Sequence, residues 1–353
     1  MTIAIRPGRD ADADSLIALI AACWGLYPGV RMDVDGEMPE LRALASYYAK
    51  AGGALWVAED AGTALGMVAV RPFDAGPHGS AGHAGQRSGG WEVCRVYVDP
   101  SRHGSGLGHA LLDTAEAHAI AAGATRLMLW SDTRFDRAHR FYEKRSYVRA
   151  GAIRVLQDIS NSLEFAYAKP VNGIEVLDAA GAASAERRLA DIMVACVDRG
   201  EGLSFLPPLA PSVARAYWKR VAGQVACGAR VLACGWASGA LAGAVMLDLD
   251  MPQDQQHRAE VKKLMVHPDA RRQGLGRAMM LRAEQEAARA RRSLLTLNAR
   301  AGGMAERIYR ASGWTEGGRI PGHTLTANGT AADTLIFWKH LPRDTGDTIP
   351  RKV

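Results

Sequence analysis

The sequence predicts an α/β fold of two tandem domains, each with a central mixed, mostly antiparallel β-sheet flanked by helices. The first observation is a repeat: WEVCRVYVDPSRHGSGLGHALL begins at Trp91, and AEVKKLMVHPDARRQGLGRAMM begins at Ala259, 168 residues later. The second is that both copies show the same order of strand-like and helix-like segments. The period is too long for a solenoid, so it indicates a duplicated domain.

The domain boundary is expected at the Pro/Asn/Gly turn cluster around residues 169–173. This boundary gives domains 1–170 and 171–353. A chain of 353 residues with 48% hydrophobic content is large enough to form two well-packed domains.

Each copy is expected to begin with a short strand, followed by one or two helices and a hairpin with a glycine turn. A strand then runs into a glycine-rich turn and a helix, followed by a strand, a short tyrosine-bearing helix and a last strand. The expected strands before the last are Ile3–Arg6, Leu55–Glu59, Leu65–Val70, Glu92–Val98 and Arg126–Trp130 in the first copy, and Ile174–Leu177, Val231–Trp236, Leu241–Leu249, Glu260–Val266 and Ser293–Asn298 in the second.

The helix after the first glycine turn has one apolar face, formed by Leu107, Leu111, Ala115 and Ala119. Gly123 follows this pattern at a position suited to end the helix. We therefore expect this helix to pack against the sheet.

The turn itself, PSRHGSGLGHALL, suggests a phosphate site. Glycine lets a backbone turn sharply and approach a ligand closely, and a helix N-terminus offers free N–H groups and a positive dipole end. Neither copy has the Gly-Lys-Ser/Thr of a Walker loop. His109 and Arg277 stand where a dinucleotide fingerprint would need its last glycine. A plain strand-to-helix connection is the alternative.

Both copies resemble the GCN5-related N-acetyltransferase family, whose acyl-CoA loop reads Gln/Arg-x-x-Gly-x-Gly/Ala. RRQGLG in the second copy matches this loop fully, whereas HGSGLG in the first has His103 in place of Gln/Arg. The resemblance covers almost the whole chain, twice. It implies acetyl-CoA (CoA) as co-substrate, with the pyrophosphate held by backbone N–H groups of the turn, and no metal.

The resemblance implies three kinds of cofactor-binding residue. Those of the turns are His103, Gly104, Ser105, Gly106, Leu107 and Gly108 in the first copy, and Arg271, Arg272, Gln273, Gly274, Leu275, Gly276 and Arg277 in the second. The strand backbones that would pair with the pantetheine amides are Val96, Tyr97 and Val98, and Leu264, Met265 and Val266. Asn298 ends a strand near CoA, and Trp130 is its counterpart.

The resemblance also assigns the catalytic residues. Tyr142 and Tyr309 match the tyrosine that protonates the leaving thiolate as a general acid, and packing aromatics are the alternative. Glu92 and Glu260 match a position that often deprotonates the amine. The alternatives are an exposed glutamate at the strand end or an ion pair with a nearby arginine. His78 and His83, in the glycine-rich stretch 74–90, are candidates to line the acceptor entrance of the first copy.

The second copy also resembles the tabtoxin-resistance acetyltransferase group, through LSFLPPLAPSVARAYWKRV and MLDLDMPQDQQHRAEVKKLMVHPDARRQGLGRAMM. The resemblance implies an N-acetyltransferase that transfers acetyl by direct attack of a small-molecule primary amine, such as an amino-acid-like compound, an antibiotic or a toxin. Two alternatives stay open. One half is a non-catalytic acyl-CoA-binding or structural domain, or the acceptor is a protein lysine or N-terminus.

Charge, motifs and cysteine usage limit the possible ligands and the cellular location. The first 170 residues carry 18 Lys/Arg and 19 Asp/Glu, so the net charge of +6 lies in the second half, which suits an anionic ligand. No nucleic-acid-binding module is apparent. We expect no signal peptide, because the N-terminus is charged early, and no membrane span, because a glycine turn interrupts the apolar run Val231–Leu247. The five cysteines form no CxxC pair and suit reduced thiols, so a cytoplasmic protein is expected. A homodimer is an open alternative for the assembly.

Overall fold

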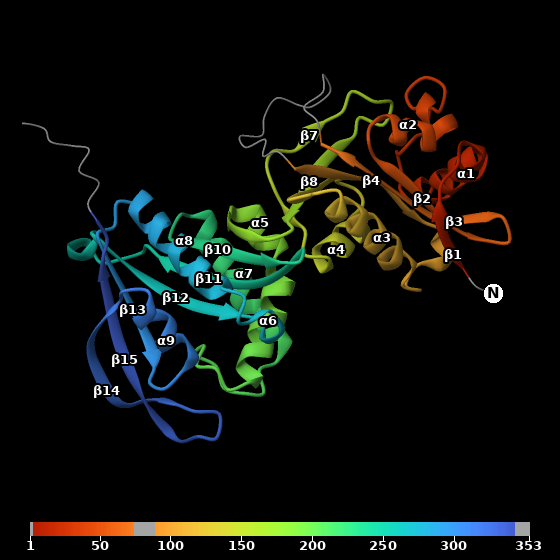
Figure 1. Ribbon diagram of the computed structural model, residues 1–353. Helices are drawn as coiled ribbons and strands as arrows, with labels where there is room; N and C mark the ends of the chain where they lie inside the picture. Colours follow the sequence, from red (N-terminus) through yellow and green to blue (C-terminus); the bar gives the residue numbers. More distant parts are fainter. Residues whose placement is uncertain (1–2, 74–88, 343–353) are drawn as a thin grey trace, which may run out of the picture. The chain divides into compact units, whose positions relative to one another are not determined.

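The structure is a computed structural model that describes residues 3–73 and 89–342, and in it the first copy forms an eight-stranded sheet (Figure 1). The sheet order is β1-β2-β3-β4-β5-β8-β6, and β7 also pairs with β8. The strands are β1 (Ala4–Pro7), β2 (Ala54–Asp60), β3 (Thr63–Pro72), β4 (Gly90–Val98), β5 (Arg126–Asp132), β6 (Val148–Arg149), β7 (Arg154–Val155) and β8 (Leu163–Pro170). The α-helices are α1 (Ala13–Trp24), α2 (Leu44–Lys50), α3 (Leu107–Ala121) and α4 (Asp136–Lys144).

The second copy repeats this plan in a seven-stranded sheet of order β14-β15-β13-β12-β11-β10-β9. Its strands are β9 (Gly173–Leu177), β10 (Arg230–Ala237), β11 (Ala240–Asp248), β12 (Arg258–Val266), β13 (Leu294–Arg300), β14 (Thr315–Leu325) and β15 (Ala331–His340). Its helices are α5 (Ala179–Ser184), α6 (Glu186–Asp198), α7 (Pro211–Ala226), α8 (Leu275–Arg289) and α9 (Met304–Ala311). The chain divides by contacts into two units, Met1–Val171 and Asn172–Val353. The predicted fold class, two tandem mixed sheets flanked by helices, is therefore confirmed.

Helices cover both faces of each sheet, so each unit has a core on either side. In the first unit α3 buries the four predicted residues of its apolar face against β2, β3 and β4. Helices α1 and α2 pack on the opposite face, against β2 and β3. In the second unit α8 takes the place of α3, and α6 and α7 take the place of α1 and α2 (Figure 1). Gly123 follows α3 with φ +91°, as expected of a helix end.

Both sheets part along a parallel strand pair. β4 pairs with β5 only from Gly90 to Glu92, and β12 pairs with β13 only from Arg258 to Glu260. Both β4 and β12 continue for six more residues, to Val98 and Val266, without a ladder to that neighbour. One edge of each strand is therefore free of sheet pairing just before the glycine turn.

A β-bulge interrupts the same two strands at equivalent positions. Arg95 has φ +52° and Lys263 has φ +55°, a conformation that non-glycine residues rarely adopt. The register with the antiparallel neighbour shifts there in both units. Bulges change the direction of side chains and are common next to active sites. The two cations are therefore candidate residues of the functional site.

The end of each copy differs from the prediction of one last strand. Three strands, β6, β7 and β8, follow the tyrosine-bearing helix in the first unit, and two follow it in the second. In the second unit these are β14 and β15, whose hairpin closes the sheet. The sequence of β14 contains three glycines and Pro321, which argues against a strand from sequence alone. Proline is tolerated there because β14 is an edge strand. None of the helices in the described ranges is long and apolar enough to cross a membrane.

Candidate functional site

The two glycine turns have the same backbone form. Gly106 and Gly274 are the N-caps of α3 and α8, with φ +88° and +81°. A Cβ built on Gly104, Gly106 or Gly274 would meet no atom within 4 Å, so the space beside the helix N-terminus is open. Arg272 occupies the position of Gly104 and keeps a left-handed φ of +64°. Each turn therefore presents an open helix N-terminus, as an anionic ligand requires.

The third glycine of each turn serves helix packing. A Cβ on Gly108 would lie 3.6 Å from the Phe141 ring, and one on Gly276 would lie 3.1 Å from Ile308. Phe141 and Ile308 belong to the tyrosine-bearing helices α4 and α9. The glycine lets that helix approach the turn closely.

His103 and Arg271 make equivalent hydrogen bonds. His103 Nε2 donates to the Val98 carbonyl at 3.1 Å, and Arg271 Nε donates to the Val266 carbonyl at 3.1 Å. A cysteine thiol donates to each of the same carbonyls at 3.3 Å, from Cys23 and Cys196. His103 thus replaces arginine in closing the turn onto the strand. Arg271 differs from His103 in one respect, since its guanidinium also forms an ion pair with Glu201.

The predicted catalytic tyrosines are both buried, with 6% exposure each. Burial raises the pKa of Tyr142 and of Tyr309 well above that of free tyrosine. Among the described residues, neither hydroxyl has a hydrogen-bond partner. A buried phenol that stays protonated and has no internal acceptor can donate a proton or a hydrogen bond to a ligand.

Glu92 forms the ion pair that the sequence offered as an alternative. Its carboxylate lies 2.7 Å from Arg71 on β3, and the Arg71 guanidinium also bonds the Tyr47 hydroxyl at 3.1 Å. The Glu92 side chain is 11% exposed.

Glu260 has different neighbours. Lys262 lies 3.1 Å from both Glu260 and Asp248, and Arg230 lies 3.2 Å from Asp248. Asp248 occupies the register position of Arg71, since each faces its glutamate across the sheet. With a side-chain exposure of 25%, Glu260 is more open to an acceptor than Glu92.

The bulge cations were not among the predicted residues. Arg95 forms a salt bridge of 2.6 Å with Glu40. Lys263 donates to neutral oxygens, the Leu203 carbonyl and Ser204 Oγ (2.8 Å), and lies over the rings of Phe205 and Tyr217. Burial, with the nearby charges of Lys262 and Arg230, lowers the pKa of Lys263 to about 8. The repeat aligns Arg95 with Lys263, but only the structure reveals the bulge.

The remaining predicted positions are distributed as follows. Asn298 is exposed on β13, and Trp130 on β5 stacks under the Arg154 guanidinium at 4.2 Å. His78 and His83 lie outside the described residues. No group of His, Cys, Asp and Glu that could hold a metal ion occurs in the described part of the chain.

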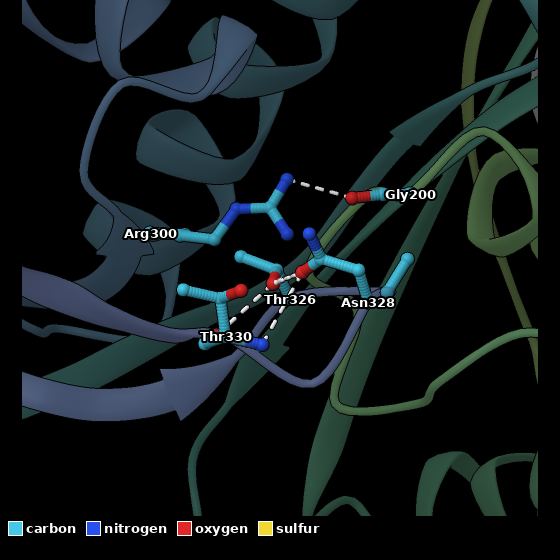
Figure 2. Close-up of a pocket in the computed structure, with 6 residues that line it drawn as sticks. Gly200, Arg300, Thr326, Asn328 and Thr330 are labelled. Atoms are coloured by element: carbon cyan, nitrogen blue, oxygen red, sulfur yellow. Dashed lines mark hydrogen bonds between the residues drawn. The ribbon is translucent and has the colours of Figure 1, made fainter.

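A hollow of about 500 Å³ lies in the second unit, next to the α6–α7 loop (residues 199–210) (Figure 2). Gly200 of that loop, Arg300 at the end of β13 and the β14–β15 turn line it. Arg300 Nη2 donates to the Gly200 carbonyl at 2.6 Å. In Figure 2 the Arg300 guanidinium and the Asn328 amide face the same space. No sequence pattern predicts this hollow, because the β14–β15 turn was not expected.

Fold and site together define a duplicated α/β protein with an open helix N-terminus, a parted strand pair and a buried tyrosine in each unit. The sequence model of the acetyltransferase (GNAT) family matches residues 16–147 and 207–309. The chain belongs to the GNAT acetyltransferase family.

Individual relatives are more distant. A stretch of 72 residues, 20% of this chain, is 39% identical to mycothiol acetyltransferase of Streptosporangium roseum, and spans 21% of that protein's length. The structure of yncA from Salmonella typhimurium with its cofactor acetyl-CoA is 16% identical, with a TM-score of 0.41 over 50% of this chain and 99% of its own. The ribosomal-protein-alanine N-acetyltransferase of Brucella melitensis is 19% identical, with a TM-score of 0.40 over 48% and 99%.

Proposed function

We propose that the chain is an acetyl-CoA-dependent N-acetyltransferase that acetylates the primary amine of a small molecule by direct attack. The observation that carries this proposal is the matched tyrosine. In each unit a buried tyrosine, whose hydroxyl has no hydrogen-bond partner among the described residues, sits on a helix that a glycine holds against the turn. Neither hydroxyl oxygen is fully enclosed, so a ligand can reach it although the ring is buried.

The residues present fit acetyl-CoA. The open space at Gly106 and Gly274 suits a pyrophosphate, and a side chain at either position would fill it. The unpaired edges of Val96–Val98 and Leu264–Val266 can bond to the pantetheine amides as an added strand would. When bound, acetyl-CoA supplies the activated acetyl thioester.

Glu260 and Tyr309 divide the proton transfers in the second unit. Glu260 accepts the proton that the acceptor ammonium must lose before its nitrogen can attack. Tyr309 donates its hydroxyl proton to the departing sulfur, and its raised pKa keeps that proton in place until then. An N–C bond forms and an S–C bond breaks. The nitrogen then loses a second proton, which restores the Tyr309 hydroxyl, so that the amide, the thiol and the one proton taken up by Glu260 are the products.

A second candidate is that the first unit binds acyl-CoA without catalysing transfer. Its charges are internally paired: Glu92 with Arg71, Arg95 with Glu40, and Asp132 with Arg134. These pairs leave no charged side chain of the set to receive an acceptor. His103 does not argue for this role, since its hydrogen bond matches that of Arg271.

The test incubates the full chain with acetyl-CoA and a panel of amino acids and amine antibiotics. Turnover is measured as the release of free thiol. If only the second unit reacts, Tyr309→Phe is expected to lower kcat by at least tenfold, and Tyr142→Phe to leave it unchanged. If both units react equally, each substitution alone only halves kcat, and the double variant loses at least tenfold. Tyr147→Phe is the control, since the Tyr147 hydroxyl bonds Glu116 in the core. Thiol release no faster than hydrolysis for every amine contradicts the proposal.

A further inference from the structure

Two cations of the second unit hold the α6–α7 loop, and neither has a carboxylate partner among the described residues. Arg300 donates to the Gly200 carbonyl at 2.6 Å. Lys263 donates to the Leu203 carbonyl and to Ser204 Oγ. Both cations therefore bind neutral oxygens of one short stretch, and their positive charge is not balanced by an ion pair. A half-buried charge without a counter-ion is costly, so it calls for an explanation.

In the first unit the charged side chains at the two equivalent positions form ion pairs. The position of Arg300 is taken there by Asp132, which forms an ion pair with Arg134 at 2.5 Å and is 6% exposed. The position of Lys263 is taken by Arg95, which is paired with Glu40. In both pairs a partner of opposite charge within the first unit balances the charge. The two units thus diverge in the same direction at two separate positions.

The hollow beside Arg300 supplies hydrogen-bond donors. Arg300 spends one N–H group on Gly200, and its other donors have no partner within the described residues. The Asn328 carbonyl oxygen accepts from Thr326 and from the Thr330 backbone, which leaves the amide N–H₂ without a described partner. None of the residues that line the hollow is acidic. A guanidinium fork and an amide match the two oxygens of a carboxylate.

We propose that the second unit takes an amine acceptor that also carries a carboxylate, and that Arg300 and Asn328 bind this carboxylate in the hollow. Lys263 adds positive charge on the other end of the same loop segment. The volume of about 500 Å³ suits a small molecule of amino-acid or dipeptide size. This proposal rests on the proposed function, since it names the substrate class of that site.

The test measures binding, so it does not depend on turnover. The full chain, saturated with CoA, is titrated in a calorimeter with the twenty amino acids, with their carboxamides and with phosphoethanolamine. The wild type is expected to bind at least one amino acid about 10- to 100-fold more tightly than its carboxamide. Arg300→Gln is expected to weaken that acid by the same factor and to leave the carboxamide unchanged.

Two controls separate recognition from folding. Arg215→Gln removes an exposed arginine of α7 and should leave binding unchanged. Arg300→Lys, which keeps the charge, should restore part of the affinity, and acetyl-CoA affinity should be the same in all variants. Equal affinity for acids and carboxamides, no binding of any acid, or tighter binding of phosphoethanolamine than of every acid overturns the carboxylate site. If the wild type binds an acid but releases no thiol, the proposed function is wrong and the carboxylate site is not affected.

Discussion

The Lys169 ammonium lies 2.9 Å from the Glu116 carboxylate, and the second unit repeats this pair as Lys339 and Glu284 at 2.8 Å. An aromatic donor completes each cluster, because Tyr147 bonds Glu116 and Trp314 bonds Glu284, both at 3.1 Å. These pairs join the last strand to the helix after the glycine turn. The duplication has therefore preserved a buried ionic cluster that lies outside the proposed chemistry.

Lys169→Met is expected to lower the free energy of unfolding by about 3 kcal/mol, because it leaves the buried Glu116 with less compensation. Lys169 is only 2% exposed, and burial lowers its pKa. Chemical denaturation of the full chain measures the loss. Lys144→Met, at an exposed position of α4, should cost less than about 0.5 kcal/mol. Equal effects of the two substitutions would show that the ionic cluster adds nothing to stability.

His139 should make the stability of the first unit depend on pH. Burial lowers the pKa of His139 below 6.5, although Nε2 donates to the Asp132 carbonyl at 2.9 Å. Below pH 6.5 the unfolded chain binds a proton that folded His139 resists, so stability falls as the pH falls through that window. His139→Gln should flatten this dependence between pH 7.5 and 5.5, as measured by denaturation. Parallel pH curves for variant and wild type would contradict the assignment.

Much of this fold could be predicted from sequence because local signals agreed with the tertiary ones. The apolar face of α3 and the left-handed glycines of the turns are local features, and the repeat confirmed them twice. The bulges at Arg95 and Lys263 could not be predicted, since a bulge depends on strand register and not on residue type. The β14–β15 hairpin was missed because glycine and Pro321 conceal an edge strand.

The sequence predicted where the candidate residues lie in the fold, but not which charged side chains pair with one another. Gly106, Gly274 and the tyrosines occupy the expected places, whereas Gly108 and Gly276 serve helix packing. The roles of all these residues toward CoA stay predictions. An ion pair of Glu92 with an arginine was one of the alternatives, but motif spacing does not identify the partner, because Arg71 lies on the neighbouring strand, 21 residues away.

Gly274→Val should abolish acetyl-CoA binding in the second unit. Its side chain would fill the open space at the helix N-terminus, and the left-handed φ of +81° would add about 1–2 kcal/mol of strain. Calorimetric titration with acetyl-CoA should then show one fewer site, as should Gly106→Val. Gly228→Val is the matched control, because Gly228 has φ +74° and equally open surroundings in a turn before β10. The same loss in Gly228→Val would assign the effect to strain alone.

Acceptor binding in the second unit should weaken as the pH rises through about 8. Lys263 has a pKa near 8, so its positive charge is present below that pH and is lost above it. The other charged groups nearby are Lys262, Arg230, Asp248 and Glu260, and Tyr217 has a pKa raised by burial. An anionic acceptor bound with help from Lys263 should therefore show a KM that rises between pH 7 and 9.

Lys263→Arg, whose charge persists at both values, should hold KM constant over that range. Lys219→Arg, on the exposed side of α7, should keep the wild-type profile. A wild-type KM that is flat with pH would exclude Lys263 from acceptor binding while leaving the role of Arg300 intact.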